Sequence, residues 1–525
     1  MKGTNKVIIR APQQQEFRNP EAILDTGKLA EWLNELPLLN PAPTVRELMD
    51  AVQAVNRQKV SNRKRLQLLD QYRKVAIQIY PSLTQDALKR ISSKENEREK
   101  IHHQVTLFCT HIADGYKIII RNLLADGNTL KNDQLFAPLY CAIEALSLAL
   151  LNCYRTYLST PEFLFQDIHQ LYLLAERSAL LNYEYESDIG SASAPSISLM
   201  YRQMMILAFL DPFKMPYGAV EQLYQRLFNL SEYCNMLSQQ PGPDQSGIFV
   251  VDLASDEAPR AIYKIPANRN LKIPRVFDTH PLTNKINADI TVIKTGQEKK
   301  ALIPEEQLLR LLIPPHKEQT TRKAERTDSH RIAKVTFGID AVYHFLTMNK
   351  TELKQALQSH ADNVGDYRME PWQVSNESKT GLSLSDRNMT QHDVRVGDII
   401  GLLTEQIDLP GSGTAELCTK IAIIRWIRNQ DNQIHIGVEL IHGNLLPATC
   451  YIVDDQDSNQ RNAGIFISSS NNENTPPTLL TPKGVYQRGR ILDITVGEQP
   501  MRIEAGYLKD DTFTFDRFDF KSNRT

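Results

Sequence analysis

The stretch Asn376-Glu377-Ser378-Lys379-Thr380-Gly381 has the form Asn-x-Ser-x-x-Gly and leads directly into the apolar alternation of Leu382 and Leu384. Asn and Ser side chains form hydrogen bonds to nearby backbone groups in turns, and glycine permits a close backbone approach or an unusual dihedral angle. The stretch therefore predicts a turn at the entrance to a strand. Upstream, Arg322-Lys323-Ala324-Glu325-Arg326 places two arginines four residues apart on a polar segment ahead of another expected strand.

Strand patterns dominate the chain around and after these two stretches. Short apolar or alternating runs predict strands at 332–337, 381–384, 398–403, 420–428 and 434–440. The last two are joined by a polar loop, 429–433, that suits a hairpin. A polar connector at 468–477 is followed by three or four further strands between 483 and 520.

The first 240 residues favour helices instead. Apolar side chains recur at helical spacing, and the expected helices are 27–36, 44–55, 61–80, 98–124, 135–158, 161–180, 194–210 and 217–238. A turn-forming stretch with Pro241-Gly242-Pro243 ends this pattern, and the strand-like run 248–253 follows it.

Composition excludes several classes of protein. With 525 residues the chain is too long for one core, and 60 basic against 62 acidic residues argue against whole-chain binding to nucleic acid or anionic membrane. The six cysteines form no Cys-x-x-Cys pair, which predicts buried reduced thiols. No hydrophobic run of signal-peptide type begins the chain, and the run 135–151 is interrupted and short for a bilayer. We therefore expect a cytoplasmic protein without membrane insertion.

Motifs for catalysis and metal binding are not found in the sequence. His102-His103 and His111 lack the metalloprotease spacing, and the Gly-Ser-Gly at 411–413 lacks the Lys-Ser/Thr of a phosphate loop. We predict no enzyme, no catalytic residues, no metal site and no resident cofactor.

In this order, each leading into a strand, the two opening stretches resemble the two-part signature of the PilZ domain, a small bacterial β-barrel that binds cyclic di-GMP. The hairpin 420–440 resembles the closing hairpin of that barrel, and Val394 to Asp398 the turn before it. The resemblance covers about 320–450. The sequence departs from the family in two ways: Thr321 rather than a second arginine precedes Arg322, and fifty positions separate Arg326 from Asn376. The excess predicts an insertion with a short helix at 350–359, which either covers the site or redirects the arginine segment.

The resemblance implies a site for cyclic di-GMP. A guanidinium suits both a phosphate and the guanine O6/N7 edge, because its planar fork donates two parallel hydrogen bonds. Arg322 and Arg326 would clasp phosphate and guanine, Asn376 and Ser378 would bond a guanine or phosphate edge, and Gly381 would shape the turn. Strand alternation is expected to place Asn376 and Ser378 on one face.

Two residues of the expected closing hairpin also bear on the site. We interpret Trp426 as a barrel core or rim residue rather than a stacking platform. Arg425 is expected to alternate with it to the opposite barrel face, where a ligand contact is an open alternative.

The fold class expected is multidomain α+β: an all-α N-terminal region, then a PilZ-like antiparallel β-barrel and a small C-terminal β unit. The expected domains are a helical domain (1–240), a β-containing connector (247–318), the PilZ-like barrel (319–455) and the C-terminal β unit (478–525). The function implied is a bacterial signalling effector that couples cyclic di-GMP binding to rearrangement of a helical domain, which docks a protein partner. The alternative is a scaffold or adaptor for a motility or pilus protein whose barrel binds no nucleotide.

Overall fold

The computed structural model describes residues 7–16, 19–37, 40–83, 95–126, 132–185, 196–239, 245–295, 305–313, 325–329, 331–358, 363–364, 367–386, 394–407, 415–430, 433–453, 461–468 and 476–523. The chain forms two compact units, Met1–Thr321 and Arg322–Thr525. The first is mainly helical and the second mainly β, which confirms the expected fold class.

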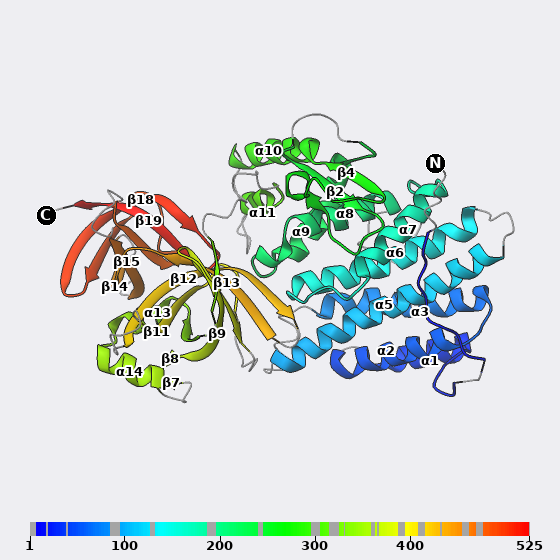
Figure 1. The fold of residues 1–525 in the computed structure, drawn as a ribbon, viewed down its shortest axis with the longest axis horizontal. Helices are drawn as coiled ribbons and strands as arrows, with labels where there is room; N and C mark the ends of the chain where they lie inside the picture. The colour runs from blue at the N-terminus through cyan, green and yellow to red at the C-terminus, as the bar shows by residue number, and fades with distance from the viewer. Residues whose placement is uncertain are drawn as a thin grey trace. The chain divides into compact units, whose positions relative to one another are not determined.

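The first unit begins with a bundle of helices (Figure 1): α1 (Thr26–Glu35), α2 (Pro41–Arg57), α3 (Asn62–Ile79), α5 (Glu95–Ala125), α6 (Asn132–Arg155), α7 (Leu164–Arg177), α8 (Ile197–Phe209) and α9 (Ala219–Leu230). Short 3-10 turns lie at Tyr80–Leu83, Pro212–Lys214, Ser231–Tyr233 and Ile262–Lys264. Helix α6 packs against α5, α7, α8 and α9. It is long and apolar enough to cross a bilayer, but most of its residues are buried inside the unit, as expected of a core helix.

A buried ion pair crosses this helical core. Arg73 on α3 is bonded through Nε to Glu144 on α6, and the two side chains are only 5% and 1% exposed. Burial lowers the pKa of Arg73, but the hydrogen bond to Glu144 and the electrostatic attraction of neighbouring groups together outweigh burial and raise that pKa above its ordinary value. Arg73 is therefore charged inside the core.

The segment expected to be a connector is a packed sheet in the first unit. Its strands are β1 (Asn235–Leu237), β2 (Ile248–Asp252), β3 (Arg260–Ala261) and β4 (Pro274–Asp278), in the order β1-β4-β2-β3, and α10 (His280–Thr295) and α11 (Glu305–Leu311) follow. Phe249 on β2 stacks on Phe209 of α8, with ring centroids 3.9 Å apart. Phe277 on β4 stacks on Tyr201 of the same helix. The sheet is thus held to the helices by aromatic burial.

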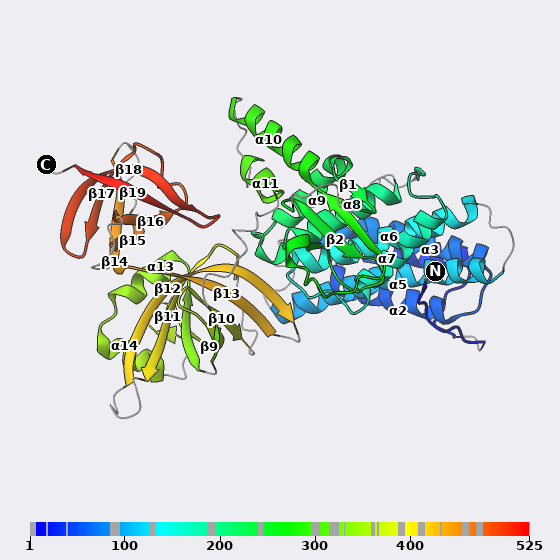
Figure 2. The same ribbon diagram turned by 45° about the horizontal axis from the view of Figure 1, so that its top comes forward.

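The second unit starts with a six-stranded antiparallel barrel (Figure 2). Its strands are β6 (Ile332–Phe337), β9 (Glu370–Glu377), β10 (Gly381–Asp386), β11 (Ile399–Ile407), β12 (Ala415–Gln430) and β13 (Gln433–Ile441). They pair in the order β10-β13-β12-β11-β6-β9, and pairing between β9 and β10 closes the ring. The short strand β5 (Thr327–Asp328) adds to the end of β9. The expected hairpin of 420–440 is present as β12 and β13.

The insertion between β6 and β9 holds α13 (Ile339–Thr347), α14 (Lys350–Gln358) and a small hairpin, β7 (Asn363–Val364) with β8 (Tyr367–Arg368). Helix α14 matches the helix expected in the insertion, whereas α13 was not expected. Leu353 and Ala356 of α14 pack with Phe345 of α13 against Leu403 on β11. In the ring, β11 lies three strands from β10 in either direction. The insertion is therefore anchored on the side of the barrel opposite the strand that Gly381 begins.

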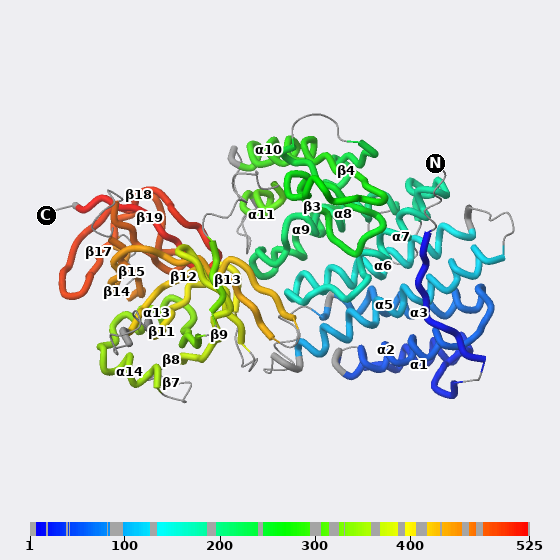
Figure 3. Tube along the Cα trace, viewed as in Figure 1, coloured from blue at the N-terminus to red at the C-terminus, as the bar shows by residue number. Residues whose placement is uncertain are grey.

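A second barrel completes the chain, and it closes in the order β14-β15-β16-β19-β18-β17. Its strands are β14 (Asn444–Ile452), β15 (Asn462–Ser468), β16 (Thr478–Pro482), β17 (Ile491–Val496), β18 (Gln499–Asp511) and β19 (Phe515–Asn523). Only two residues separate β13 from β14. In Figure 3 the second barrel is the part of the tube that runs from orange to red at the C-terminus. The expected boundary, a barrel ending at 455 and a unit beginning at 478, is wrong. Strands β14 and β15 pair within the second barrel, and most of the expected connector 468–477, between β15 and β16, lies outside the described residues.

The two barrels share an apolar core cluster. Ile421, Ile423 and Ile441 on the outer surface of the first barrel are buried against Ile465 and Phe515 of the second. Each such side chain contributes about 1.5–3 kcal/mol when fully buried, so these contacts hold the barrels together.

Candidate functional site

The stretch 376–381 forms the tight hairpin between β9 and β10, as the sequence predicted. Ser378 closes the turn, because its N–H donates to the carbonyl oxygen of Gly381 at 2.8 Å. Its hydroxyl oxygen also accepts a hydrogen bond from the Gly381 N–H at 3.2 Å. The Ser378 hydroxyl thus holds the turn together from within.

Gly381 is required for a close approach between strands. A Cβ atom at this position would lie 2.3 Å from the carbonyl oxygen of Val438 on β13. No side chain fits in that space, so the glycine lets β10 pair with β13. Gly381 lies opposite Glu439 in this pairing.

A bulge in β9 decides which way Asn376 faces. Leu384 on β10 pairs with Val374, and Ser383 pairs with Asn376, so Ser375 has no partner in the β10 ladder. Directly opposite residues share a face of a sheet. Val374 and Leu384 are buried in the barrel core, whereas Asn376 and Ser383 lie on the opposite face, where Asn376 is half-buried and Ser383 is covered. A regular strand would have put Asn376 on the same face as Val374, inside the barrel.

Arg326 meets Asn376 across fifty positions of sequence. Its Nη1 donates to Asn376 Oδ1 at 3.0 Å. The strand β5 makes this possible, because Thr327 and Asp328 pair with Glu377 and Asn376. Arg326 has no carboxylate partner among the residues that the structure describes, so its charge is available to an anion. Arg322 lies outside the described residues.

A different arginine neutralises the acidic residue of the motif. Arg331, which precedes β6, forms an ion pair with Glu377 through Nη2. This pair neutralises Glu377, so the charged side chains that remain beside Asn376 are Arg326 and Asp328, which lies opposite Asn376 on β5. Arg331 therefore has a structural role in the ion pair with Glu377, whereas Arg326 is exposed beside Asn376.

Trp426 is a further residue of this outer face. It pairs with Gly437 across β12 and β13, Gly437 pairs with Ser383, and Ser383 pairs with Asn376. With strands about 4.8 Å apart, this row spans about 14 Å. A Cβ atom on Gly437 would lie 1.8 Å from the Trp426 Nε1, so the indole ring lies directly over the glycine. Gly437 in the middle of a strand was the sequence signal for this close approach.

The expected alternation of Arg425 and Trp426 to opposite barrel faces is wrong. Ile424 pairs with Val438 and Trp426 with Gly437, so Arg425 is the extra residue of a second bulge. Arg425 then points outward as well, and its Nε donates to Glu439 Oε2 at 2.7 Å. The extra residue in the bulge interrupts the regular alternation of side chains between the two faces of the strand, on which the expectation depended.

The face offers the exposed guanidinium of Arg326, the half-buried amide of Asn376 and the half-buried indole ring of Trp426. Guanidinium groups bind phosphate and guanine edges, and an indole provides a surface on which a base stacks. The part of the chain that the structure describes brings together no group of three His, Cys, Asp or Glu side chains able to hold a metal ion.

Comparison with known proteins identifies three regions of the chain. Residues 27–241 match the family model described as the N-terminal domain of the cyclic-di-GMP receptor FimW. Residues 248–370 match the middle PilZ domain of FimW, and residues 448–523 match the FimW C-terminal beta-barrel domain. The middle match begins in the β2–β4 sheet and ends at the start of β9, before the 376–381 turn.

A curated relative matches along nearly the whole chain. It is the cyclic-di-GMP receptor FimW of Pseudomonas aeruginosa, 23% identical over 562 aligned residues, which cover 94% of this chain and 89% of that protein. The descriptions name a receptor, in agreement with the expectation that the chain is not an enzyme. Because three consecutive regions match the three domain models described for FimW receptors, in the same order, the chain belongs to the PilZ-domain proteins.

Proposed function

We propose that this protein binds cyclic di-GMP on the outer face of its first barrel, with Arg326, Asn376, Ser378 and Gly381 forming the site and Arg322 completing it. The observation that carries the proposal is the hydrogen bond between Arg326 and Asn376, because it joins the two halves of the sequence motif on one surface. The FimW receptor of Pseudomonas aeruginosa, a relative over most of the chain, supports the choice of ligand.

The side chains of this face have separate roles in the proposed complex. Arg326 binds a phosphate or a guanine edge, and Asn376 orients that arginine in the free protein and bonds the ligand when it is present. Ser378 and Gly381 keep the hairpin tight enough for Asn376 to reach the ligand. Trp426 offers one base a stacking surface at the other end of the row.

Titration calorimetry of the whole protein with cyclic di-GMP tests this proposal. A charge-assisted hydrogen bond is worth roughly 1.5–3 kcal/mol. Since about 1.4 kcal/mol is a tenfold change in affinity, Arg326→Ala should weaken binding about tenfold or more. The matched control is Arg502→Ala, since Arg502 is an exposed arginine on β18 with an ion pair to Asp493. No heat and no thermal shift with the wild-type protein would favour the adaptor interpretation instead.

Coupling between ligand and helical domain is the second part of the proposal. The boundary between the two compact units falls between Thr321 and Arg322, directly before the arginine segment. A ligand that orders 322–326 against the barrel would restrict the connection to the helical unit, and this differential affinity would shift the arrangement of the units. The helical unit would then present a surface to a protein partner.

Small-angle X-ray scattering with and without cyclic di-GMP tests the coupling. We expect a ligand-dependent change in the radius of gyration that is absent in Arg326→Ala. Identical scattering curves at saturating ligand would refute the coupling while leaving binding intact. The five buried thiols among the six free cysteines support a reducing compartment, and we place the protein in the cytoplasm.

A further inference from the structure

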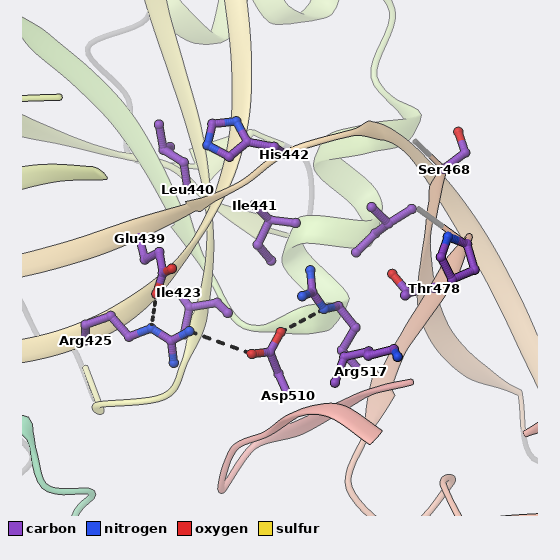
Figure 4. Close-up of a pocket in the computed structure, with 13 residues that line it drawn as sticks. Ile423, Arg425, Glu439, Leu440, Ile441, His442, Ser468, Thr478, Asp510 and Arg517 are labelled. Carbon is purple, nitrogen blue, oxygen red and sulfur yellow. Dashed lines mark hydrogen bonds and ion pairs between the residues drawn. The ribbon is translucent and has the colours of Figure 1, made fainter. Parts of the chain in front are cut away.

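A cavity of about 490 Å³ lies at the junction of the two barrels. Figure 4 shows side chains from both barrels pointing into it: Arg425, Glu439 and His442 come from the first barrel or its end, and Asp510 and Arg517 come from β18 and β19 of the second. Its volume falls in the range of small-molecule sites, about 300–1,000 Å³.

The cavity adjoins the proposed nucleotide face. Glu439 in its wall lies directly opposite Gly381, whose neighbour across the hairpin turn is Ser378. Paired strands are about 4.8 Å apart, so the cavity wall begins one strand away from the motif glycine. Arg425, also in the wall, precedes Trp426 of the outer row.

Charged groups in the cavity form a chain that crosses from one barrel to the other. Arg425 bonds Glu439 and lies 3.8 Å from Asp510 through its Nη2. Arg517 Nε lies 2.7 Å from Asp510 Oδ2. Asp510 is thus shared between two guanidinium groups, one from each barrel.

This arrangement is complementary to a guanine base. Guanine presents the acceptors O6 and N7 on one edge and N–H donors beside them, and arginine is the side chain that pairs best with the O6/N7 edge. The cavity is lined by two guanidinium groups and Lys509 as donors and by two carboxylates as acceptors, a combination that a phosphate alone does not need. Adenine has an amino donor in place of O6, so it cannot accept hydrogen bonds from a guanidinium group at both positions of that edge.

We propose that the junction cavity is the second half of the cyclic di-GMP site, in which one guanine base lies against Arg425 and Arg517 while the other half of the ligand contacts Arg326 and Asn376. The inference rests on the proposed function and adds that the C-terminal barrel supplies a ligand-binding residue, Arg517. It also makes that barrel the element that reads the base.

Calorimetry of the full-length protein with cyclic di-GMP and with cyclic di-AMP tests this assignment. The variants are Arg517→Gln and Arg425→Gln, and the control is Arg502→Gln. Arg502 lies on the same barrel with an equivalent ion pair to Asp493, but does not line the cavity. We expect either cavity variant to weaken cyclic di-GMP binding about tenfold or more, the effect of losing a charge-assisted hydrogen bond. In the same variants the ratio of cyclic di-GMP affinity to cyclic di-AMP affinity should also fall, because glutamine pairs with adenine. The control should change neither value.

The outcomes separate the two proposals. If Asn376→Ala abolishes binding but both cavity variants bind as tightly as wild type, the inference is overturned and the proposed function stands. Equal losses in Arg517→Gln and Arg502→Gln would also overturn it, since they would reflect general damage to the second barrel. Wild-type protein that does not bind cyclic di-GMP would overturn both. Because Arg425 and Arg517 lie on different barrels, a folding defect in one variant still leaves the other to test the proposal.

Discussion

Gly437→Ala is the substitution for which the structure predicts the clearest effect. The new Cβ atom would lie 1.8 Å from Trp426 Nε1 and 2.1 Å from Trp426 Cε2. Real Cβ contacts are essentially never below 3.0 Å, so the indole must move by at least 1.2 Å or leave the sheet. Either response costs about 1–3 kcal/mol, the usual effect of overpacking a fitted contact.

A double-mutant cycle isolates this contact. In the Trp426→Ala background the ring is absent, so Gly437→Ala should cost little there, and the coupling energy should equal most of the single-mutant cost. Hydrogen exchange followed by mass spectrometry on peptides of β12 and β13 reports the local opening free energy without requiring two-state unfolding of a multidomain chain. Gly401→Ala is the control. Gly401 lies on β11, away from Trp426, and a Cβ atom there would lie 2.8 Å from the side chain of Phe345 on α13.

Two results would refute the reasoning. Gly437→Ala that costs the same with and without Trp426 would mean that the ring does not lie over the glycine. An unchanged opening free energy in the single variant would mean the same. If the cycle behaves as expected, loss of cyclic di-GMP affinity in Gly437→Ala can be attributed to displacement of the ring from the outer face.

Three further predictions concern the first unit and the thiols. Arg73→Met should destabilise the helical unit by about 3–5 kcal/mol, because it removes one partner of the buried ion pair between Arg73 and Glu144. The Arg73→Met/Glu144→Met double variant should recover most of that loss in urea denaturation, and a double variant less stable than Arg73→Met would contradict this. Burial, against the weaker effect of a backbone hydrogen bond, lowers the pKa of His169 to about 4. The neutral His169 contributes on the order of 3 kcal/mol to the free energy of unfolding above the unfolded pKa of about 6.5, and this stability is lost as the pH falls toward 4. His169→Gln should remove this pH dependence from the unfolding free energy. Ellman's reagent should react with Cys418 alone in the native protein and with all six thiols after denaturation, because the other five are buried; rapid reaction of more than one native thiol would be inconsistent with that burial.

Much of the architecture was available from local patterns. Helical spacing in the first 240 residues and alternation after 332 reflect how each segment buries its own apolar face, which neighbouring residues determine. The turn at 376–381 was predictable for the same reason, since Ser378 and Gly381 form hydrogen bonds with each other. The boundary of the second barrel was not predictable, because nothing local shows that β14 pairs with β17 rather than with β13.

The sequence by itself determined the class of protein, the order of helical and β regions, and the residue types of the site. Only the tertiary structure decided which faces those residues occupy. Bulges at Ser375 and Arg425 turn Asn376, Arg425 and Trp426 to the outer surface, and a bulge depends on pairing with a distant strand rather than on its own sequence. The junction cavity likewise exists only because Arg425 and Arg517, ninety-two positions apart, come from two closed barrels that share one apolar cluster. Long-range pairing brings such residues together, and no periodicity along the chain encodes it.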